Sequence, residues 1–351
     1  MFLRLALRGS KTSSVFVRRN SFVASVKLSE VLRKDDIQCR EYKEQGKFLI
    51  LNDRGNPVIE GPADAKALVR NSSQKDYGKF SLGFATYDVA QYLGSMEDSV
   101  FLGIDPADEK ALFGISAKTD EDTLEVGDGL VFLNWRAGFF LLKETHVQLM
   151  CRASSMLTWH RNFKFCSRCG APAQRNVSGS FITCSKCGAK YFPATSPAGI
   201  VLIRNRSDDA VLLVQHTQKM RPTRQVYYTC VAGFCDMGEG IEDAVRREVA
   251  EEVGLEVERV KYLRSQHWPF PASSLMIGCT AMCDDKIEPV IDLDELVDAR
   301  WYSRKQVGEC LRVADESPWK AVTGGGDFSI PPKGTAAYAL IKSWFSGDES
   351  Q

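Results

Sequence analysis

The sequence lacks any long apolar run, since no stretch approaches the roughly 18 consecutive apolar residues of a membrane-spanning helix. We therefore expect no membrane insertion. It also lacks an excess of either charge, because 45 Lys and Arg residues face 45 Asp and Glu residues. No bulk basic charge is therefore present to hold a nucleic-acid backbone. With 44% hydrophobic and 26% charged residues among 351, the composition excludes disordered and collagen-like chains and predicts two or three globular domains.

Acidic residues are missing from the first 29 positions, which hold six basic residues and six serines. Arg4, Arg8 and Lys11 recur at the spacing of one helix face. A basic, serine-rich, acid-free and amphipathic N-terminus is typical of a mitochondrial transit peptide. We expect residues 1–28 to be such a peptide and the protein to be mitochondrial. The alternative is a frayed basic terminus, because composition is the only support.

Four of the 11 cysteines have the spacing of a metal site. Cys166 and Cys169 form one C-x2-C pair, and Cys184 and Cys187 form a second pair after 14 intervening residues. Each pair can present two thiolates to one tetrahedral ion, and a glycine after each pair permits a tight turn. The pattern predicts a structural Zn²⁺ ribbon, because four protein ligands leave no open position for catalysis.

Basic residues surround these ligands in sequence, and two explanations for them stay open. They neutralise the two negative charges of a zinc–tetrathiolate centre, or they bind an anionic partner. The residues are Arg161, Lys164, Arg168, Lys186 and Lys190.

Hydrophobic periodicity outlines the remaining organisation. Residues 29–145 alternate charged loops with strand-like runs at 47–51, 99–104, 129–135 and 139–142, and residues 143–163 form a helical pattern that leads into the ribbon. Beyond residue 194, strand-like runs at 198–205, 210–216, 257–263, 275–283 and 299–303 and a helix at 334–345 predict a mixed α/β domain. The expected parts are a transit peptide at 1–28, an N-terminal domain at 29–145, a linker helix with the zinc ribbon at 146–193 and the mixed α/β domain at 194–346.

The stretch from 233 to 255 carries the chemistry. Glu248, Glu251 and Glu252 stand at i, i+3 and i+4, so a helix would gather three carboxylates on one face. Like charges at this spacing repel each other, and a hard cation such as Mg²⁺ or Mn²⁺ gives a reason to gather them. Arg247 can orient one of these carboxylates through a forked hydrogen bond.

The same stretch resembles the Nudix box, G-x5-E-x7-R-E-U-x-E-E-x-G-U, in which U is aliphatic. A solvated charged helix would explain the acids but not the spacing of the glycines. The resemblance implies a Nudix α/β/α sandwich and hydrolysis of a nucleoside diphosphate linked to another group. Every position of the box matches: Gly233, Glu239, Arg247, Glu248, Val249, Glu251, Glu252, Gly254 and Leu255.

The flanking segments resemble the NADH pyrophosphatase family of Nudix enzymes. Residues 265–276, SQHWPFPASSLM, are similar to its SQPWPFPxS…LM motif, and a WHR-x3-FC sequence at 159–166 enters the ribbon as in that family. With the transit peptide, the chain resembles the mitochondrial NAD(P)H pyrophosphatase branch. The family also has an N-terminal α+β Nudix-like domain. Three features depart from it: His267 replaces a proline, the segment is one residue longer, and Phe192 replaces a stacking tyrosine.

This resemblance implies roles for individual residues. The metal ligands would be Glu248, Glu252, Glu295 and the carbonyl of Ala232, with Glu251 sharing in metal binding or orientation. The catalytic residues would be Glu248, Glu251 and Glu252, of which Glu252 helps to deprotonate the attacking water. The aromatic rings offer stacking faces to a dinucleotide. The implied substrate-binding residues are Phe192, Gln266, His267, Trp268, Pro269, Phe270, Pro271, Ser273, Ser274 and Ala337.

Three functions stay open on the sequence. The first is hydrolysis of NADH, NADPH and NAD⁺ to nicotinamide mononucleotide and AMP, or to 2′,5′-ADP from NADPH. The second is the same cleavage at the 5′ NAD cap of an RNA. The third is a non-catalytic Nudix-fold binding module, against which the intact set of carboxylates argues. The resemblance also implies a homodimer.

Overall fold

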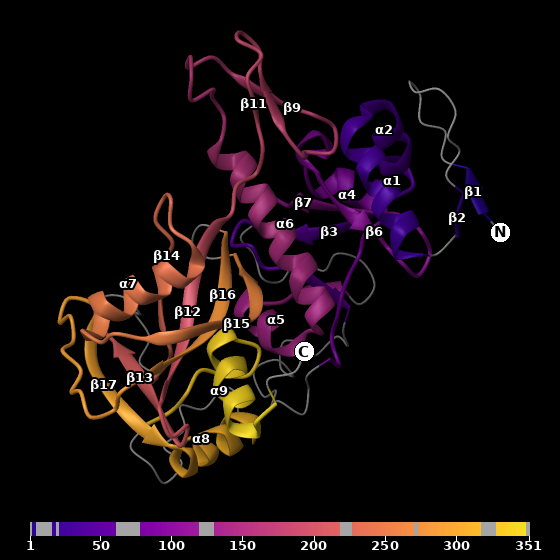
Figure 1. The fold of residues 1–351 in the computed structure, drawn as a ribbon. Coiled ribbons are helices and arrows are strands. Elements are labelled where there is room, and N and C mark those ends of the chain that lie inside the picture. The colour runs from indigo at the N-terminus through magenta and orange to yellow at the C-terminus, as the bar shows by residue number, and fades with distance from the viewer. Residues whose placement is uncertain are drawn as a thin grey trace. The chain divides into compact units, whose positions relative to one another are not determined.

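The computed structural model describes residues 2–4, 16–18, 21–60, 78–118, 130–217, 227–269, 273–316 and 328–348 (Figure 1). The chain forms two compact units, one reaching Ala194 and the other beginning at Thr195. No helix in these described segments is long and apolar enough to cross a membrane.

The first unit contains two small sheets and a set of helices. One sheet has the order β3 (Lys47–Leu51), β7 (Ala111–Ser116), β6 (Val100–Ile104), and the other has the order β5 (Ser81–Leu82), β4 (Val58–Glu60), β8 (Leu130–Phe132). The helices are α1 (Phe22–Lys34), α2 (Asp36–Glu44), α4 (Tyr87–Leu93), α5 (Trp135–Leu141), α6 (Glu144–Asn162) and a short 3-10 turn, Met96–Asp98. Stacked and edge-on rings of Phe48, Phe101 and Phe113 fill its core. The expected N-terminal α+β domain is confirmed.

The extreme N-terminus differs from the helical expectation. Strand β1 (Phe2–Arg4) pairs antiparallel with β2 (Phe16–Arg18), so the helix predicted from Arg4 onward is wrong at its start; Arg8 and Lys11 lie outside the described residues. Aromatic and β-branched residues, here Phe2, Phe16 and Val17, favour an extended backbone over a helix. The first described helix, α1, begins at Phe22, and a transit-peptide boundary at residue 28 therefore falls inside it.

A second difference concerns residues 139–142. The sequence predicted a strand, but Phe139 and Leu141 belong to α5, where both are buried. Periodicity cannot separate a short buried helix from a buried strand, because both present a nearly continuous apolar run. Helices α1, α2 and α4 were not anticipated either. Helix α1 begins within the residues assigned to the transit peptide, and α2 and α4 have only nine and seven residues, too few to show a clear helical period.

The ribbon is a three-stranded antiparallel sheet within the first unit, made of β9 (Ala173–Arg175), β10 (Ile182–Cys184) and β11 (Lys190–Tyr191). The turn between β9 and β10 is anchored to the end of α1. Asn176 Nδ2 and Ser180 Oγ donate to the carbonyl of Arg33 at 2.9 and 3.1 Å, and the Val177 N–H donates to Asp36 at 3.0 Å. The first two bonds use a carbonyl that the helix end leaves unsatisfied.

The second unit is built on one mixed sheet. Its strands run in the order β15 (Glu258–Trp268), β16 (Ser274–Cys283), β12 (Ser196–Asn205), β13 (Ala210–His216) and β17 (Leu296–Ser303), and β14 (Val231–Phe234) also pairs with β12. Strands β12 and β16 are parallel, and the other pairs are antiparallel. Its helices are α7 (Ile241–Val253), α8 (Arg304–Glu316) and α9 (Ala336–Ser346).

The alternation of side chains along β12 explains the layers of this unit. Ile200 and Leu202 enter one core with residues of α8 and α9, whereas Val201 and Ile203 enter a separate core with residues of α7. Successive strand residues point to opposite faces, so a strand covered on both faces is apolar almost throughout. The predicted α/β/α sandwich is confirmed.

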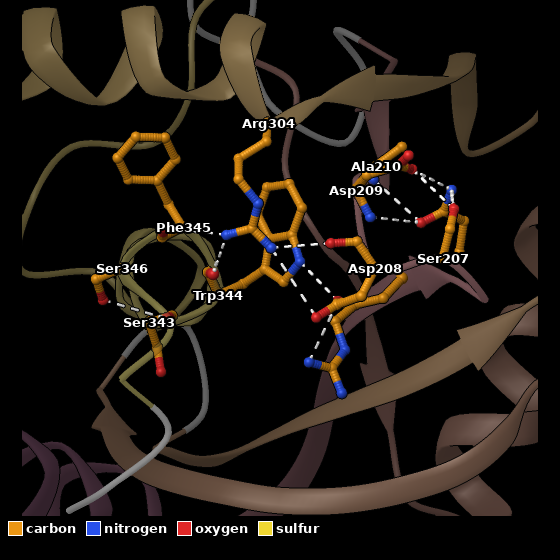
Figure 2. Close-up of polar contacts among 11 residues, drawn as sticks. Ser207, Asp208, Asp209, Ala210, Arg304, Ser343, Trp344, Phe345 and Ser346 are labelled. Carbon is orange, nitrogen blue, oxygen red and sulfur yellow. Dashed lines mark hydrogen bonds and ion pairs between the residues drawn. The ribbon is translucent and has the colours of Figure 1, made fainter.

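The C-terminal end of α9 is held by a polar cluster (Figure 2). The Arg304 guanidinium lies 4.2 Å from the ring centroid of Trp344 and donates to the carbonyls of Trp344 and Phe345 at 2.7 and 3.0 Å. Arg304 also donates to the carbonyl of Asp208, whose carboxylate accepts from the Trp344 indole at 2.9 Å. A cation thus satisfies the last carbonyls of the helix and joins α9 to the β12–β13 hairpin.

Candidate active site and zinc centre

Helix α7 carries the cluster of glutamates. Glu242 and Asp243 occupy its first turn, where carboxylates suit the helix dipole, and Gly254 closes it in the left-handed conformation at φ 64°. Val245 and Val249, one turn apart, pack into the core beneath. Burying this apolar stripe fixes the rotation of the helix, and therefore which glutamates can reach the strands.

The three glutamates of the motif have different surroundings. Glu252 is only 2% exposed, the Glu248 side chain is 14% exposed, and the Glu251 side chain is 58% exposed. Their spacing on one helix predicted proximity, but these differences come from the strands and loops that pack against α7.

Arg247 organises the carboxylates around it. Its guanidinium forms a forked pair with Glu239 at 2.7 and 2.9 Å, and one nitrogen donates to Glu248 at 2.8 Å and to Glu251 at 2.9 Å. The sequence predicted that Arg247 orients one carboxylate, whereas in the structure it contacts three. The bonds from Arg247, together with the Asp236 N–H, lower the pKa of Glu239 to about 2.

Glu248 shows the opposite electrostatic effect. Burial raises its pKa, Arg247 opposes that rise, and the negative charges of Glu251 and Glu295 add to it. The influence of Glu295 places that residue close to the α7 carboxylates, although it is 43 positions beyond Glu252 in the sequence. A site that gathers this much negative charge suits a cation.

The loop that carries Glu295 is tied to the end of α7. The Asp292 N–H donates to the Glu252 carbonyl at 2.9 Å, and the Val290 N–H donates to the Val253 carbonyl at 2.9 Å. Two backbone bonds therefore hold this loop against the helix. Nothing in the sequence near Glu295 indicates this contact.

Gly233 is required by close packing. A Cβ atom at this position would lie 1.9 Å from Cδ of Glu248, so the carboxylate rests directly over the backbone of β14. Ala232, the residue before Gly233 in β14, pairs with Ile200 of β12. The predicted carbonyl ligand is therefore adjacent in sequence to the glycine on which the Glu248 carboxylate rests.

The donor set fits a hard divalent cation in its chemistry. Buried carboxylate oxygens and a main-chain carbonyl are the ligands that Mg²⁺ and Mn²⁺ prefer. Among the residues described, however, only the four cysteines form a tight group of three or more metal-ligand side chains. Glu248, Glu252 and Glu295 do not close into such a group.

The segment proposed to hold substrate lies at the end of β15. Gln266, His267 and Trp268 pair with residues of β16, and the Gln266 amide donates to the Gly334 carbonyl at 2.7 Å, just before α9. Ala337 lies in the first turn of α9 and is 4% exposed. The structure therefore brings together Gln266 and the N-terminal end of α9, which sequence spacing could not link.

The rest of this segment is partly described. Pro269 and Ser274 are buried, and Ser273 adopts a left-handed backbone at φ 57° while its carbonyl accepts from the Ser196 N–H at 3.1 Å. Phe270 and Pro271 lie outside the described residues. Burial lowers the pKa of His267, which keeps its ring neutral near pH 7.

The four cysteines converge as the spacing predicted. Their sulfur atoms all lie within 4.8 Å of one another, with 3.7 Å between Cys166 and Cys187 and 3.5 Å between Cys169 and Cys184. A zinc ion with Zn–S bonds of about 2.3 Å needs sulfur separations of about 3.8 Å, so this geometry fits Zn²⁺.

The two halves of the zinc centre repeat each other. Each has the sequence C-S-[R/K]-C-G-A, and each ends at a glycine with a left-handed backbone, φ 71° at Gly170 and φ 67° at Gly188. In both, the glycine N–H donates to the carbonyl of the first cysteine. Phe192 follows the second half; its ring is 63% exposed and lies 6.0 Å from that of Phe181.

Three family models match successive parts of the chain: a NADH pyrophosphatase-like rudimentary NUDIX domain at residues 46–159, a NADH pyrophosphatase zinc ribbon domain at 161–192 and a NUDIX domain at 194–322. The protein named NAD(P)H pyrophosphatase NUDT13, mitochondrial, of Homo sapiens is 32% identical over 93% of this chain and 91% of its own length.

The chain belongs to the NADH pyrophosphatase family of Nudix hydrolases.

Two further relatives of this NADH pyrophosphatase-family enzyme carry another name. The NAD-capped RNA hydrolase ndx-9 of Caenorhabditis elegans is 30% identical over 99% of this chain and 95% of its own length. The NAD-capped RNA hydrolase NUDT12 of Homo sapiens is 36% identical over 58% of this chain and 42% of its own length.

As a Nudix enzyme, the chain combines the box residues with contacts that the box does not contain. The ties from Asp292 and Val290 to α7, and the bond from Gln266 to Gly334, join segments that are far apart in sequence. No local pattern around these residues predicts the contacts, because backbone groups make most of them.

Proposed function

We propose that the protein hydrolyses the pyrophosphate bond of NADH and NADPH, and also of NAD⁺. The products are nicotinamide mononucleotide and AMP, or 2′,5′-ADP from NADPH. The observation that carries the proposal is the carboxylate cluster on α7, oriented by Arg247 and packed over Gly233. The name of the human relative, which aligns over 91% of its own length, supports the substrate class.

Glu248, Glu252, Glu295 and the carbonyl of Ala232 would hold Mg²⁺ or Mn²⁺. The bound cations would supply neutralisation of the diphosphate charge and a lower pKa for water. Glu252 takes the proton of the attacking water, and its burial keeps bulk solvent away from that transfer. Arg247 fixes the direction of the Glu248 and Glu251 carboxylates, with Glu251 assisting.

The ends of the dinucleotide would be bound by the segment at the end of β15, including His267, Trp268, Phe270, Pro271 and Ser273, together with Ala337. For Phe192, in the first unit, the family resemblance is the support for a stacking role. Rings stack on flat bases, and prolines keep an extended segment free of competing backbone donors. Zn²⁺ at the four cysteines would be structural.

Cleavage of an RNA 5′ NAD cap is the second candidate. It has the same bond chemistry, and the name of the nematode relative, which aligns over 95% of its own length, favours it. One experiment separates the candidates: kcat/KM of purified protein for NADH, NADPH, NAD⁺ and an NAD-capped RNA, each with Mg²⁺ and with Mn²⁺. Hydrolysis of none of them would contradict both candidates and favour a non-catalytic binding module.

The N-terminal residues 1–28 would direct the protein to the mitochondrion, which the name of the human relative supports. A fluorescent protein fused behind these residues is expected to enter mitochondria, and diffuse fluorescence in the cell would contradict the proposal. We also propose a homodimer, which light scattering of the purified protein tests by its mass.

A further inference from the structure

The charged residues of the zinc ribbon are all basic. Residues 145–207 contain no Asp or Glu, and within the ribbon, residues 161–192, six basic residues face no acid. Five of the six are exposed, and none of these five forms an ion pair with another described residue. We call these five the ribbon basic surface: Arg161, Lys164, Arg168, Lys186 and Lys190.

Neutralisation of the zinc centre accounts for only part of this surface. Four thiolates and Zn²⁺ leave two negative charges. Arg168 lies between the two cysteines of the first C-x2-C pair, and Lys186 lies between those of the second. These two positive charges equal the two negative charges in number. Arg161, Lys164 and Lys190 lie outside the two C-x2-C pairs, so the charge of the metal centre does not explain their presence.

Aromatic rings lie among these basic residues. Phe165 is 63% exposed, and the Lys190 ammonium lies 4.9 Å from the centroid of the Phe181 ring. Trp159, Phe163 and Tyr191, all partly exposed, form a row with centroid separations of 5.3 and 5.0 Å.

Basic side chains interspersed with exposed aromatic rings match the chemistry of one ligand class. The positive side chains hold a phosphate backbone, and the aromatic rings stack on unpaired nucleobases. A duplex hides the faces of its nucleobases, and a peptide of Asp and Glu alone offers no flat rings, so neither uses both features. We propose that the zinc ribbon is a binding surface for single-stranded RNA, separate from the residues that hydrolyse the pyrophosphate bond.

This inference deepens the second candidate function, cleavage of an NAD cap, because it gives the RNA body its own place on the enzyme. It does not require that activity, since RNA without a cap would bind the same surface.

The test measures binding of a 5′-hydroxyl single-stranded RNA of about 12 nucleotides to the full-length, zinc-loaded protein across a range of salt concentrations. A triple variant, Arg161→Gln with Lys164→Gln and Lys190→Gln, is expected to bind at least tenfold more weakly. Its slope of log Kd against log salt should fall by about 2, since each lost phosphate contact removes about 0.7. Its zinc content and its NADH hydrolysis should match the wild type.

The matched control removes three other exposed charges, Lys110→Gln with Lys261→Gln and Lys305→Gln, and should bind RNA within about twofold of wild type. Phe165→Ala should weaken binding about tenfold without changing the salt slope, because stacking is not electrostatic. Tyr92→Ala, at a ring 89% exposed on α4, is its control.

Equal RNA affinity of the two triple variants would overturn the proposal. So would equal competition by a poly-glutamate peptide, which would indicate a general anion surface, or no RNA binding by the wild type. If RNA binds through the ribbon and NADH is not hydrolysed, the proposed function fails and this inference stands. If NADH is hydrolysed and no RNA binds, the reverse holds.

Discussion

At the scale of single residues, the site depends on how differently three neighbouring glutamates are placed. Glu252 is buried, Glu248 lies over the backbone of Gly233, and Glu251 is mostly exposed. A buried carboxylate is shielded from bulk water and suits proton transfer, whereas an exposed one is screened and contributes less. We therefore assign the proton transfer to Glu252.

Changing Glu252→Gln should lower kcat for NADH by about 10²- to 10⁴-fold, because the amide cannot take a proton. Stability in urea should change little, since the amide has nearly the same shape. Glu251→Gln is the matched control and should lower kcat by less than about tenfold. Near wild-type turnover of the Glu252 variant would rule out its role as the base.

Changing Gly233→Ala should abolish most activity while preserving the fold. The added methyl group needs the space of the Glu248 carboxylate, and a flexible side chain will move before the backbone does. We expect a loss of about 10²-fold or more in kcat/KM with a small change in melting temperature. Gly240→Ala, whose Cβ would meet nothing closer than 3.6 Å, should keep its activity within about threefold. Equal effects of the two changes would contradict this explanation.

His160 links α6 to the ribbon and should make stability depend on pH. Burial lowers its pKa to about 4, and its Nε2 lies 2.7 Å from the Gly179 carbonyl, to which the neutral ring can donate. Because this value lies below about 6.5 for an unfolded histidine, the stabilisation is complete above pH 6.5 and is lost as pH falls towards 4.

The expected loss between these pH values is up to about 3 kcal/mol of unfolding free energy. Urea titrations of wild type and His160→Gln at several pH values measure it, because glutamine can donate the same bond but does not titrate. The two stabilities should converge as the solution becomes more acidic. Parallel pH profiles would show that His160 is not the source.

At the scale of elements, α9 connects the segment at the end of β15, which we propose holds substrate, to the sheet of the second unit. Its N-terminal end follows Gly334, which accepts from Gln266, and its C-terminal end is capped by Arg304 (Figure 2). A helix held at both ends transmits a displacement of one end to the other. We therefore expect the position of Gln266 to depend on contacts at the far end of α9.

Arg304→Gln should destabilise the protein by about 1 to 3 kcal/mol, because a charged donor to the last carbonyls of α9 and the stacking on Trp344 are both lost. KM for NADH should rise as well, since α9 supports Gln266. Urea unfolding and steady-state kinetics measure the two effects. Lys305→Gln, at the next residue and exposed, is the control; if it has the same effect, capping is not the cause.

At the scale of the whole molecule, charge is distributed by function. The first 29 residues and residues 145–207 contain no acid, while the box helix concentrates carboxylates where a cation would sit. The net charge of zero is an average over these parts. An acidic site can therefore act on an anionic substrate when divalent cations carry the attraction.

The first helix also sets how much of the N-terminus can be removed. Ser21 caps α1, and Ala24 and Leu28 are buried in the core of the first unit. A chain that starts at Ser21 should keep wild-type stability, whereas one that starts at Ser29 should lose about 2 to 4 kcal/mol of unfolding free energy. Urea titrations of both chains measure the difference. Equal stabilities would favour a transit-peptide boundary at residue 28.

The strands of the catalytic unit and the zinc ligands were predictable from the sequence, and some helices were not. Strand β12 and the four cysteines follow local rules, namely apolar runs for strands covered on both faces and fixed ligand spacing for zinc. Residues 139–142 were assigned wrongly because a short apolar run fits both a helix and a strand. The strand Phe2–Arg4 contradicts a helix pattern because pairing with β2 outweighs local periodicity.

The sequence by itself determined the family, the reaction class and the zinc ligands, because each depends on residue types at short, fixed spacing. Only the tertiary structure decided which glutamate is buried, why Gly233 carries no side chain, how the loop of Glu295 reaches α7, and that Gln266 is tied to Gly334. These contacts join backbone and side-chain groups tens of residues apart. Packing forms them, and packing has no local pattern in the sequence.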